Sequence, residues 1–188
     1  RPSLCIDCKK MIQPEFHILV CNSSLKLVDT TFRFFCPTTF LKQEHKTFLW
    51  EQSIQDVEAV IKVYCHRSFL THWREKQFHF RVEREFESLS KLYQANIPSS
   101  QPLFWGYGNC TRFGHFEVLA MRKIPNVIPL KMFLQKVDKK TDLPKLEILF
   151  QHIRHMHEAG IYHGALSPKN ILVAADSGNL PTFYIIDM

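Results

Sequence analysis

Apolar residues follow a strand-like spacing in the first part of this 188-residue chain and a helical spacing in much of the rest. The first part contains short segments of β-branched and aromatic residues with turn-like breaks between them, which is typical of strands. The expected strands span residues 16–20, 25–28, 31–36, 47–51 and 57–64, with a hairpin turn at 22–24. These segments predict a β-rich region at the start of the chain.

A helix is expected after these strands. Apolar residues recur there at spacings of three and four, which describes one face of a helix. The residues on that face are Phe78, Val82, Leu89 and Leu92, together with the carboxylate of Glu85. Pro98 and Pro102 then break the pattern.

The second half of the chain predicts strands, two helices and a closing hairpin. Strands are expected at 103–106 and 115–121, helices at 129–136 and 143–159 with Gly160 as a C-terminal stop, and paired strands at 171–174 and 182–186 joined by a turn at 176–179. This order predicts an α+β chain with a β-rich region at 1–121 and a helical region at 122–188. Because clefts between such regions hold most ligands, a nucleotide site is expected between them.

Two charged residues fall where the pattern predicts burial. Glu85 lies on the apolar face of its helix, and Lys62 lies within the apolar strand at 57–64. A buried charge is unfavourable unless it is paired, so these residues predict an ion pair between strand and helix. In nucleotide phosphotransferases such a pair holds the lysine against the α- and β-phosphates. The alternative is that Lys62 extends to solvent and Glu85 lies at the rim of the interface.

The closing hairpin brings two oxygen ligands together. Asn170 stands just before its first strand and Asp187 just after its second. Antiparallel pairing therefore predicts both side chains at the same end of the hairpin, where an amide oxygen and a carboxylate suit Mg²⁺. Magnesium there would bridge nucleotide phosphates. The alternative is that both are turn residues at strand ends, which is common for each alone.

Residues 163–170, with the sequence HGALSPKN, resemble the kinase catalytic-loop pattern H-R-D-L-x-x-x-N, and an apolar strand follows them. Asp187 resembles the metal-binding aspartate of kinases, Lys62 the strand lysine and Glu85 the helix glutamate, all in the expected chain order. The resemblance covers residues 45–188. It implies a protein-kinase-like two-lobe fold, with an antiparallel β N-lobe carrying one helix and a helical C-lobe that is truncated in this sequence.

Three further segments resemble the lipopolysaccharide-core (Kdo/WaaP-type) kinases more than the eukaryotic protein kinases. They are YCHRS at 64–68 with the basic stretch after it, REFESL at 84–89 running into ANIP at 95–98, and IDM at 186–188. This resemblance implies ATP-dependent phosphorylation of a sugar hydroxyl in the inner core of lipopolysaccharide, at the cytoplasmic face of the inner membrane.

The resemblance also implies roles for single residues. Lys62 would hold phosphates, Glu85 would orient Lys62, Asn170 and Asp187 would hold Mg²⁺, and the adenine of ATP would lie against the backbone at Ala120, Met121 and Arg122.

The chain departs from the family pattern in the catalytic loop. Ala165 stands where the pattern has the aspartate that accepts the proton of the substrate hydroxyl, and a methyl group cannot act as a base. His163 and Ser167 are near in sequence, but neither is an obvious replacement, and His163 more often has a structural role in this loop. The chain is therefore a slow enzyme, an enzyme with another base, a copy with an engineered mutation, or a pseudokinase that serves as a nucleotide- or partner-binding scaffold.

A second departure concerns the phosphates of the nucleotide. No glycine lies between Leu25 and Lys62, so the glycine-rich loop that covers the phosphates in protein kinases is missing. A turn near Pro37 would have to use other groups, and the hydroxyls of Thr38 and Thr39 are candidates.

The net charge of +6 favours an anionic partner. Many basic residues fall between Lys62 and Arg84, interleaved with aromatic ones. This segment is either a solvated basic helix or a surface for phosphate-bearing ligands. An anionic glycolipid of the lipopolysaccharide core, or the inner-membrane surface, fits it better than nucleic acid. A basic membrane-surface module without nucleotide chemistry is a third hypothesis.

The six cysteines are scattered along the sequence, and the default expectation is reduced thiols in the cytoplasm. Only Cys5 and Cys8 have a metal-type spacing; His17 and Cys21 could complete a zinc site, although this spacing matches no common zinc module.

No run of about eighteen apolar residues is present, so no membrane span is expected. These features predict a cytoplasmic location, at the inner-membrane surface if the glycolipid is the substrate.

Overall fold

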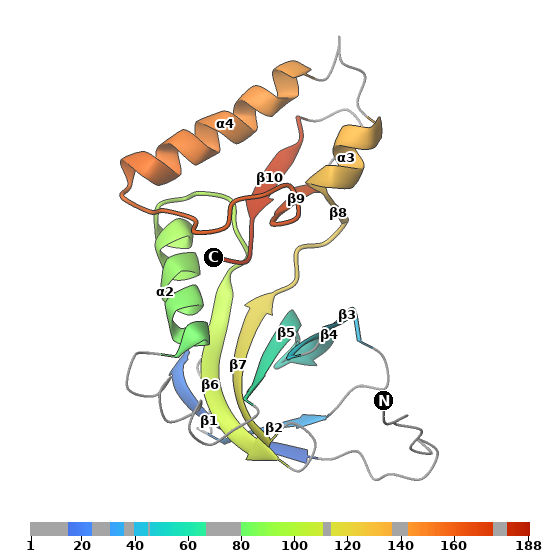
Figure 1. Ribbon diagram of the computed structural model, residues 1–188, viewed down its shortest axis with the longest axis vertical. Helices are drawn as coiled ribbons and strands as arrows, with labels where there is room; N and C mark the ends of the chain where they lie inside the picture. The colour runs from blue at the N-terminus through green and yellow to red at the C-terminus, as the bar shows by residue number, and fades with distance from the viewer. Residues whose placement is uncertain are drawn as a thin grey trace.

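The computed structural model describes residues 15–23, 31–35, 40–44, 46–66, 80–110, 114–136, 143–174 and 180–188 (Figure 1). The strands in these ranges are β1 (Glu15–Ser23), β2 (Thr31–Phe35), β3 (Lys42–Glu44), β4 (Thr47–Ile54), β5 (Val57–His66), β6 (Pro102–Cys110), β7 (Gly114–Arg122), β8 (Val127–Pro129), β9 (Ile171–Ala174) and β10 (Thr182–Ile185). The helices are α2 (Arg81–Gln94), α3 (Leu130–Lys136) and α4 (Leu143–Glu158).

Seven of the described strands form one antiparallel sheet in the order β2-β1-β6-β7-β5-β4-β3. The strand β5 pairs with β4 on one side and with β7 on the other. In the register of β5 with β7, Lys62 lies opposite Leu119 and Tyr64 lies opposite Glu117. Because side chains alternate along a strand, Lys62, Tyr64 and His66 lie on one face of the sheet.

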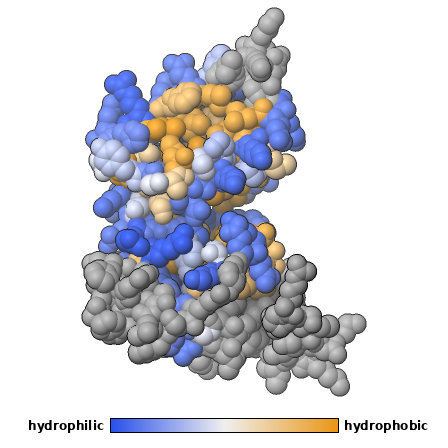
Figure 2. Space-filling model, in the orientation of Figure 1, coloured by the Kyte–Doolittle hydropathy of each residue, from blue (hydrophilic) through white to orange (hydrophobic). Residues whose placement is uncertain are grey.

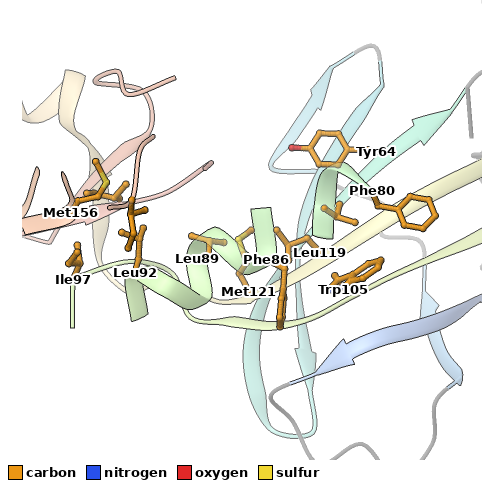
Figure 3. Packing of buried hydrophobic residues seen from close by; sticks show 13 residues of the cluster. Tyr64, Phe80, Phe86, Leu89, Leu92, Ile97, Trp105, Leu119, Met121 and Met156 are labelled. Atoms are coloured by element: carbon orange, nitrogen blue, oxygen red, sulfur yellow. The ribbon is translucent and has the colours of Figure 1, made fainter. Parts of the chain in front are cut away.

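The helix α2 covers that face. Its buried residues are Val82, Glu85, Phe86, Leu89 and Leu92, and all but Glu85 belong to an apolar cluster with Tyr64, Trp105, Leu119 and Met121 of the sheet (Figure 3). The same cluster includes Met156, Ile161 and Ile185 from the second half of the chain. The predicted apolar face of this helix is therefore confirmed, and it joins the large sheet to the later elements. A second cluster fills the opposite face and includes Trp50, Ile61, Phe104, Val118 and Ala120.

Both long helices end in the same hydrogen-bonded turn. After α2, Asn96 has a left-handed backbone (φ 55°), and the N–H of Ile97 donates to the carbonyl of Leu92 at 3.0 Å. After α4, Gly160 has φ 70°, and the N–H of Ile161 donates to the carbonyl of Met156 at 3.0 Å. This pattern satisfies carbonyls at the helix end that would otherwise lack partners. The prediction of Gly160 as a helix stop is confirmed.

The strands β8, β9 and β10 form a small antiparallel sheet in the order β10-β9-β8. It shares an apolar cluster with α3 and α4, in which Leu130, Leu149, Ile171, Val173 and Phe183 are buried. Apolar surface gathers over this part of the molecule (Figure 2), where Met132, Leu134, Phe150 and Leu180 are among the exposed large apolar side chains. No helix in the described ranges is long and apolar enough to cross a bilayer.

The structure confirms the α+β class and corrects several details. Asn22 and Ser23 belong to β1 and pair with β6, so the hairpin turn expected at 22–24 is wrong for these two residues. The edge strands β3 and β8 were not expected, because they are three residues long and lack an alternating apolar pattern. Pro129 ends β8 and does not begin the helix that follows.

Some expectations fall outside the described residues. These are the strand at 25–28, the turn at 176–179 and the helical position of Phe78. The large sheet ends at Arg122 and the next strand begins at Val127, but the division of the chain into domains at 121 and 122 stays a prediction.

The buried face of α2 gives a stability prediction. Leu89 is fully buried, so Leu89→Ala should lower the free energy of unfolding by about 2–5 kcal/mol, from lost burial and the cavity left behind. Urea unfolding followed by circular dichroism would measure this change. The exposed Glu87 on the same helix is the control, and Glu87→Ala should change the value by less than about 0.5 kcal/mol. Equal effects of the two substitutions would contradict the packing described for α2.

Candidate active site

Lys62 is the centre of a buried group of charges. Its side chain is only 6% exposed, and its Nζ lies 2.7 Å from Oε1 of Glu85 on α2. The same Nζ also pairs with the carboxylate of Asp187, which follows β10. The hydroxyl of Tyr64 donates to the other oxygen of Glu85 at 3.2 Å. The predicted ion pair between strand and helix is therefore present, and the alternative with Lys62 in solvent is wrong.

Burial and charge act against each other in this group. Burial by itself would lower the pKa of the Lys62 ammonium, but the negative charges around it, with Glu85 first, hold the pKa above its ordinary value. Burial raises the pKa of the Glu85 carboxyl, against the attraction of Lys62. Burial and the nearby Glu85 raise the pKa of Tyr64 to about 12. Lys62 therefore stays protonated, and the Tyr64 hydroxyl stays a donor, at neutral pH.

Asp187 reaches Lys62 because of the hairpin register. Ile185 of β10 lies opposite Ile171 of β9, and the N–H of Ile186 donates to the carbonyl of Asn170 at 3.0 Å. Asp187 itself has a left-handed backbone (φ 64°). Burial would raise the pKa of its carboxyl, but the Lys62 ammonium holds that pKa below the ordinary value. The prediction that Asn170 and Asp187 lie at the same end of the hairpin is confirmed.

Asn170 is oriented by the loop that precedes it. Its Nδ2 donates to the backbone carbonyl of Ala165 at 3.0 Å. Because a carbonyl can only accept, the amide nitrogen must face the loop and Oδ1 is left for another ligand. Asn170 and Asp187 both line one cavity, so an amide oxygen and a carboxylate are available there.

His163 is held in one tautomer by two backbone groups. The N–H of Ala165 donates to Nδ1 of His163 at 3.2 Å, so Nδ1 is the acceptor nitrogen. Nε2 then carries the proton and donates to the carbonyl of Ile186 at 2.9 Å. Because both ring nitrogens are occupied, His163 links the loop to the segment before Asp187 and has no nitrogen free to act as a base. Ala165 itself is exposed and contributes only a methyl group.

A cavity of about 720 Å³ lies beside these residues, within the usual size for small-molecule sites. The predicted site residues in its lining are Lys62, Glu85, Met121, Arg122, Asn170 and Asp187. His163 and Ala165 are not in the lining, although Ala165 holds Asn170. The side chain of Ala120 is buried in the cluster on the opposite face of the large sheet, so only its backbone could serve a nucleotide.

Three other predicted sites lie wholly or partly outside the described residues. Cys5, Cys8, Thr38 and Thr39 lie outside the described residues, and His17 and Cys21 are described only as parts of the backbone of β1. Within the part of the chain that the structure describes, no group of three or more His, Cys, Asp or Glu side chains could hold a metal ion. Of the basic segment between Lys62 and Arg84, residues 67–79 also lie outside the described ranges.

Tyr64 and Glu117 lie at the interface between the large sheet and α2, but neither was predicted as a site residue. Glu117 is fully buried on β7, where it contacts His66 and the start of α2. The signal that identified Glu85, a carboxylate within an apolar pattern, is also present at Glu117 in the apolar stretch 115–121. Its partners are His66 and the backbone N–H of Val82, and no sequence pattern identifies a backbone N–H as a partner.

The family model for the lipopolysaccharide kinase (Kdo/WaaP) family matches residues 43–188, which is more than half of the chain. The chain belongs to this family. No curated protein sequence matches it. The match agrees with the predicted resemblance, and it includes every residue of the group around Lys62 and of the loop at 163–170.

Solved structures show that the fold is protein-kinase-like. A structure of WaaP in complex with acyl carrier protein has a TM-score of 0.53 at 12% identity, over 79% of this chain and 59% of that chain. A crystal structure of Rad53 1–466 in complex with AMP-PNP has a TM-score of 0.56 at 17% identity, over 80% of this chain and 38% of that chain. The chain therefore spans less than two thirds of the length of either structure.

The buried pair in this kinase-family chain gives a second stability prediction. Lys62→Met leaves Glu85 buried without its partner, so it should destabilise the fold by about 3–5 kcal/mol. The double variant Lys62→Met with Glu85→Leu removes both charges and should recover most of that loss. Chemical unfolding of the two variants at neutral pH would measure the difference.

Lys42 is the matched control, because it pairs with Glu44 on an exposed strand. Lys42→Met should change stability by less than about 1 kcal/mol. A double variant less stable than Lys62→Met alone would show that the pair does not behave as one buried unit.

Proposed function

We propose that this chain carries the nucleotide site of an ATP-dependent phosphotransferase that acts on a sugar hydroxyl of the lipopolysaccharide inner core. The observation that carries the proposal is the Lys62–Glu85 ion pair, joined to Asp187 at a cavity that Asn170 also lines. In phosphoryl transfer most of the catalysis comes from positioning and charge stabilisation, which is the chemistry that these four residues can supply.

Lys62 is the residue suited to hold the phosphates. It stays protonated because of its carboxylate partners, and Glu85 with Tyr64 fixes the direction of its side chain. A lysine that is held in place by a helix glutamate loses little conformational freedom when phosphate binds. The adenine would lie at the other part of the cavity, near Met121 and Arg122.

The backbone of Arg122 limits how an adenine could bind. Its N–H donates to the carbonyl of Gln101 at 2.8 Å, and its carbonyl accepts the hydroxyl of Ser100 at 2.8 Å. The N–H is therefore already used and the carbonyl keeps one lone pair, so adenine recognition would depend on that carbonyl, on Met121 and on the neighbouring lining residues, whereas Ala120 is paired with strands on both sides. The role of these three residues remains part of the proposal.

Asp187 and Asn170 fit a magnesium ion. Mg²⁺ in nucleotide sites is held by one or two protein oxygens, with phosphate oxygens and water completing its shell. Asp187 offers a carboxylate and Asn170 offers Oδ1, because Nδ2 of the amide is bonded to Ala165. A bound Mg²⁺ would offset the charge that develops on the transferred phosphoryl group.

The proposed acceptor of the phosphoryl group and the proposed partners are inferred from the charge of the cavity lining and from the lipopolysaccharide kinase family. The cavity lining includes the cations Arg81, Arg122 and Lys169, and the charge of Arg81 also acts on the carboxylate of Asp187. An anionic glycolipid such as the lipopolysaccharide core suits this lining, and as the substrate it would bring the protein to the cytoplasmic face of the inner membrane. The WaaP structure contains acyl carrier protein, which makes a carrier protein a second candidate partner.

The second candidate function is that of a pseudokinase scaffold, and Ala165 favours it. A lost general base typically reduces a rate by about 10²–10⁴-fold. His163 cannot replace it in this geometry, because both of its ring nitrogens are hydrogen-bonded. The scaffold would keep the nucleotide site and lose proton removal from the acceptor.

The proposed function predicts that the protein binds Mg-ATP. Saturating Mg-ATP should raise the melting temperature by about 5 °C, because a ligand that binds only the folded state stabilises it. Lys62→Ala and Asp187→Ala should each abolish the shift in a thermal-denaturation assay. Lys91→Ala, an exposed residue on α2, is the control and should keep the shift. A wild-type protein with no shift at millimolar Mg-ATP would rule out the nucleotide site.

Phosphotransfer separates the two candidate functions. With radiolabelled ATP and purified core oligosaccharide, Ala165→Asp should transfer phosphate about 100-fold faster than the wild type if the base is simply missing. A wild type that is inactive beside an active variant identifies a pseudokinase. Equal, fast rates would show that another group removes the proton, and the assignment of the base to position 165 would then be wrong.

A further inference from the structure

Glu117 is a fully buried carboxylate to which the proposed phosphotransfer gives no role. It lies on β7, at the interface between the large sheet and α2. A buried carboxylate is unfavourable unless its oxygens have partners. Both oxygens of Glu117 have one: Oε1 lies 2.6 Å from Nε2 of His66, and Oε2 accepts the backbone N–H of Val82 at 3.0 Å.

The bond to Val82 supplies a cap that α2 lacks in its own sequence. The first four N–H groups of a helix have no partner within the helix, and a Ser, Thr, Asp or Asn before it usually supplies one. The residue before α2 is Phe80, whose side chain makes no capping hydrogen bond. Glu117 supplies the acceptor from a neighbouring strand, and its charge is favourable at the positive end of the helix.

The cap fixes the turn that carries Glu85. Residues three apart lie on the same face of a helix, and both Val82 and Glu85 are buried against the sheet. If the N–H of Val82 left Glu117, the first turns of α2 could move or rotate. Glu85 would then leave Lys62, whose Nζ is now 2.7 Å from its carboxylate.

The register of β5 and β7 places the two contacts side by side. Tyr64 of β5 lies opposite Glu117 of β7. On the same face of β5, Lys62 lies two residues to one side of Tyr64 and binds Glu85, and His66 lies two residues to the other side and binds Glu117. The sheet therefore holds α2 at two points, directly through Lys62 of β5 and through Glu117 of β7, which His66 contacts, and both contacts use a buried carboxylate.

We propose that Glu117 is a positioning residue: together with His66 it fastens the first turn of α2 to the sheet and so keeps Glu85 on Lys62. The effect of Glu117 on nucleotide binding rests on the proposed function, because nucleotide binding requires Lys62 to be held in place. The contact itself can be examined without any nucleotide.

The binding experiment uses Glu117→Leu, which removes both hydrogen bonds, and Glu117→Gln, which keeps an oxygen for the N–H of Val82. Isothermal titration with Mg-AMP-PNP should show an affinity about tenfold lower for Glu117→Leu, the size expected for a lost helix cap. Glu117→Gln should stay within about threefold of the wild type. The control Glu87→Gln, at an exposed position on the same helix, should have no effect.

A double-mutant cycle distinguishes positioning from a general loss of stability. If Glu117 acts through Glu85, then Glu117→Leu should cause little further loss of affinity when Glu85→Gln is already present. A full tenfold further loss in that background would overturn the proposal. So would an unchanged affinity in a folded Glu117→Leu protein.

Amide hydrogen exchange, measured without nucleotide, tests the contact between Glu117 and α2 independently of nucleotide binding. Glu117→Leu should speed exchange at residues 82–85 at least about tenfold, with a smaller change at 89–92. If Glu117→Leu does not fold, Glu117→Gln should show a smaller rise that is still confined to 82–85. A uniform rise along α2, or none, would overturn the proposal. A wild type that binds no nucleotide but shows this local effect would instead overturn the proposed function and leave the positioning contact standing.

Discussion

The pairing of Lys62 with Glu85 is the interaction on which the arrangement of this protein depends. Both side chains are almost completely buried, at 6% and 2% exposure, and neither charge would be stable there alone. Asp187 joins the same ammonium, so one lysine connects the large sheet, α2 and the closing hairpin. Any motion of one of these three parts therefore has to break a contact with the buried Lys62 ammonium, which keeps the walls of the cavity in a defined geometry.

The loop around Ala165 orients Asn170 without using the side chain at position 165. The backbone N–H of Ala165 donates to His163, and its carbonyl accepts from Asn170. Both contacts use the backbone, so the loop keeps its conformation and orients Asn170 whatever side chain stands at position 165. The loss of a carboxylate there removes a base without disturbing the candidate metal ligands. This is why the same structure is compatible with a slow kinase and with a nucleotide-binding scaffold.

Much of this site could be predicted because its charged residues stand within apolar sequence patterns. Lys62 in an apolar strand and Glu85 on an apolar helix face each require a partner, and each carries the opposite charge that the other needs. Asn170 and Asp187 flank paired strands, and antiparallel pairing allows only one relative position. Glu117 was missed although it has the same signature, because its partners are a histidine and a backbone N–H. The edge strands β3 and β8 were missed because they are held by hydrogen bonds of the backbone, with little apolar patterning.

The sequence by itself determined the long helices and most of the longer strands, two charges that must be paired, and that the loop at 163–170 lacks a carboxylate. These properties are local, since they depend on the spacing of apolar residues and on the chemistry of single side chains. Only the tertiary structure decided that Lys62 meets both Glu85 and Asp187, that His163 has no free nitrogen, and that Glu117 caps α2. Apart from the bond between His163 and Ala165, those contacts join residues at least 23 positions apart, and Lys62 and Asp187 are separated by 125 positions. They exist because the strand register and the packing of α2 fix distances that no local pattern contains.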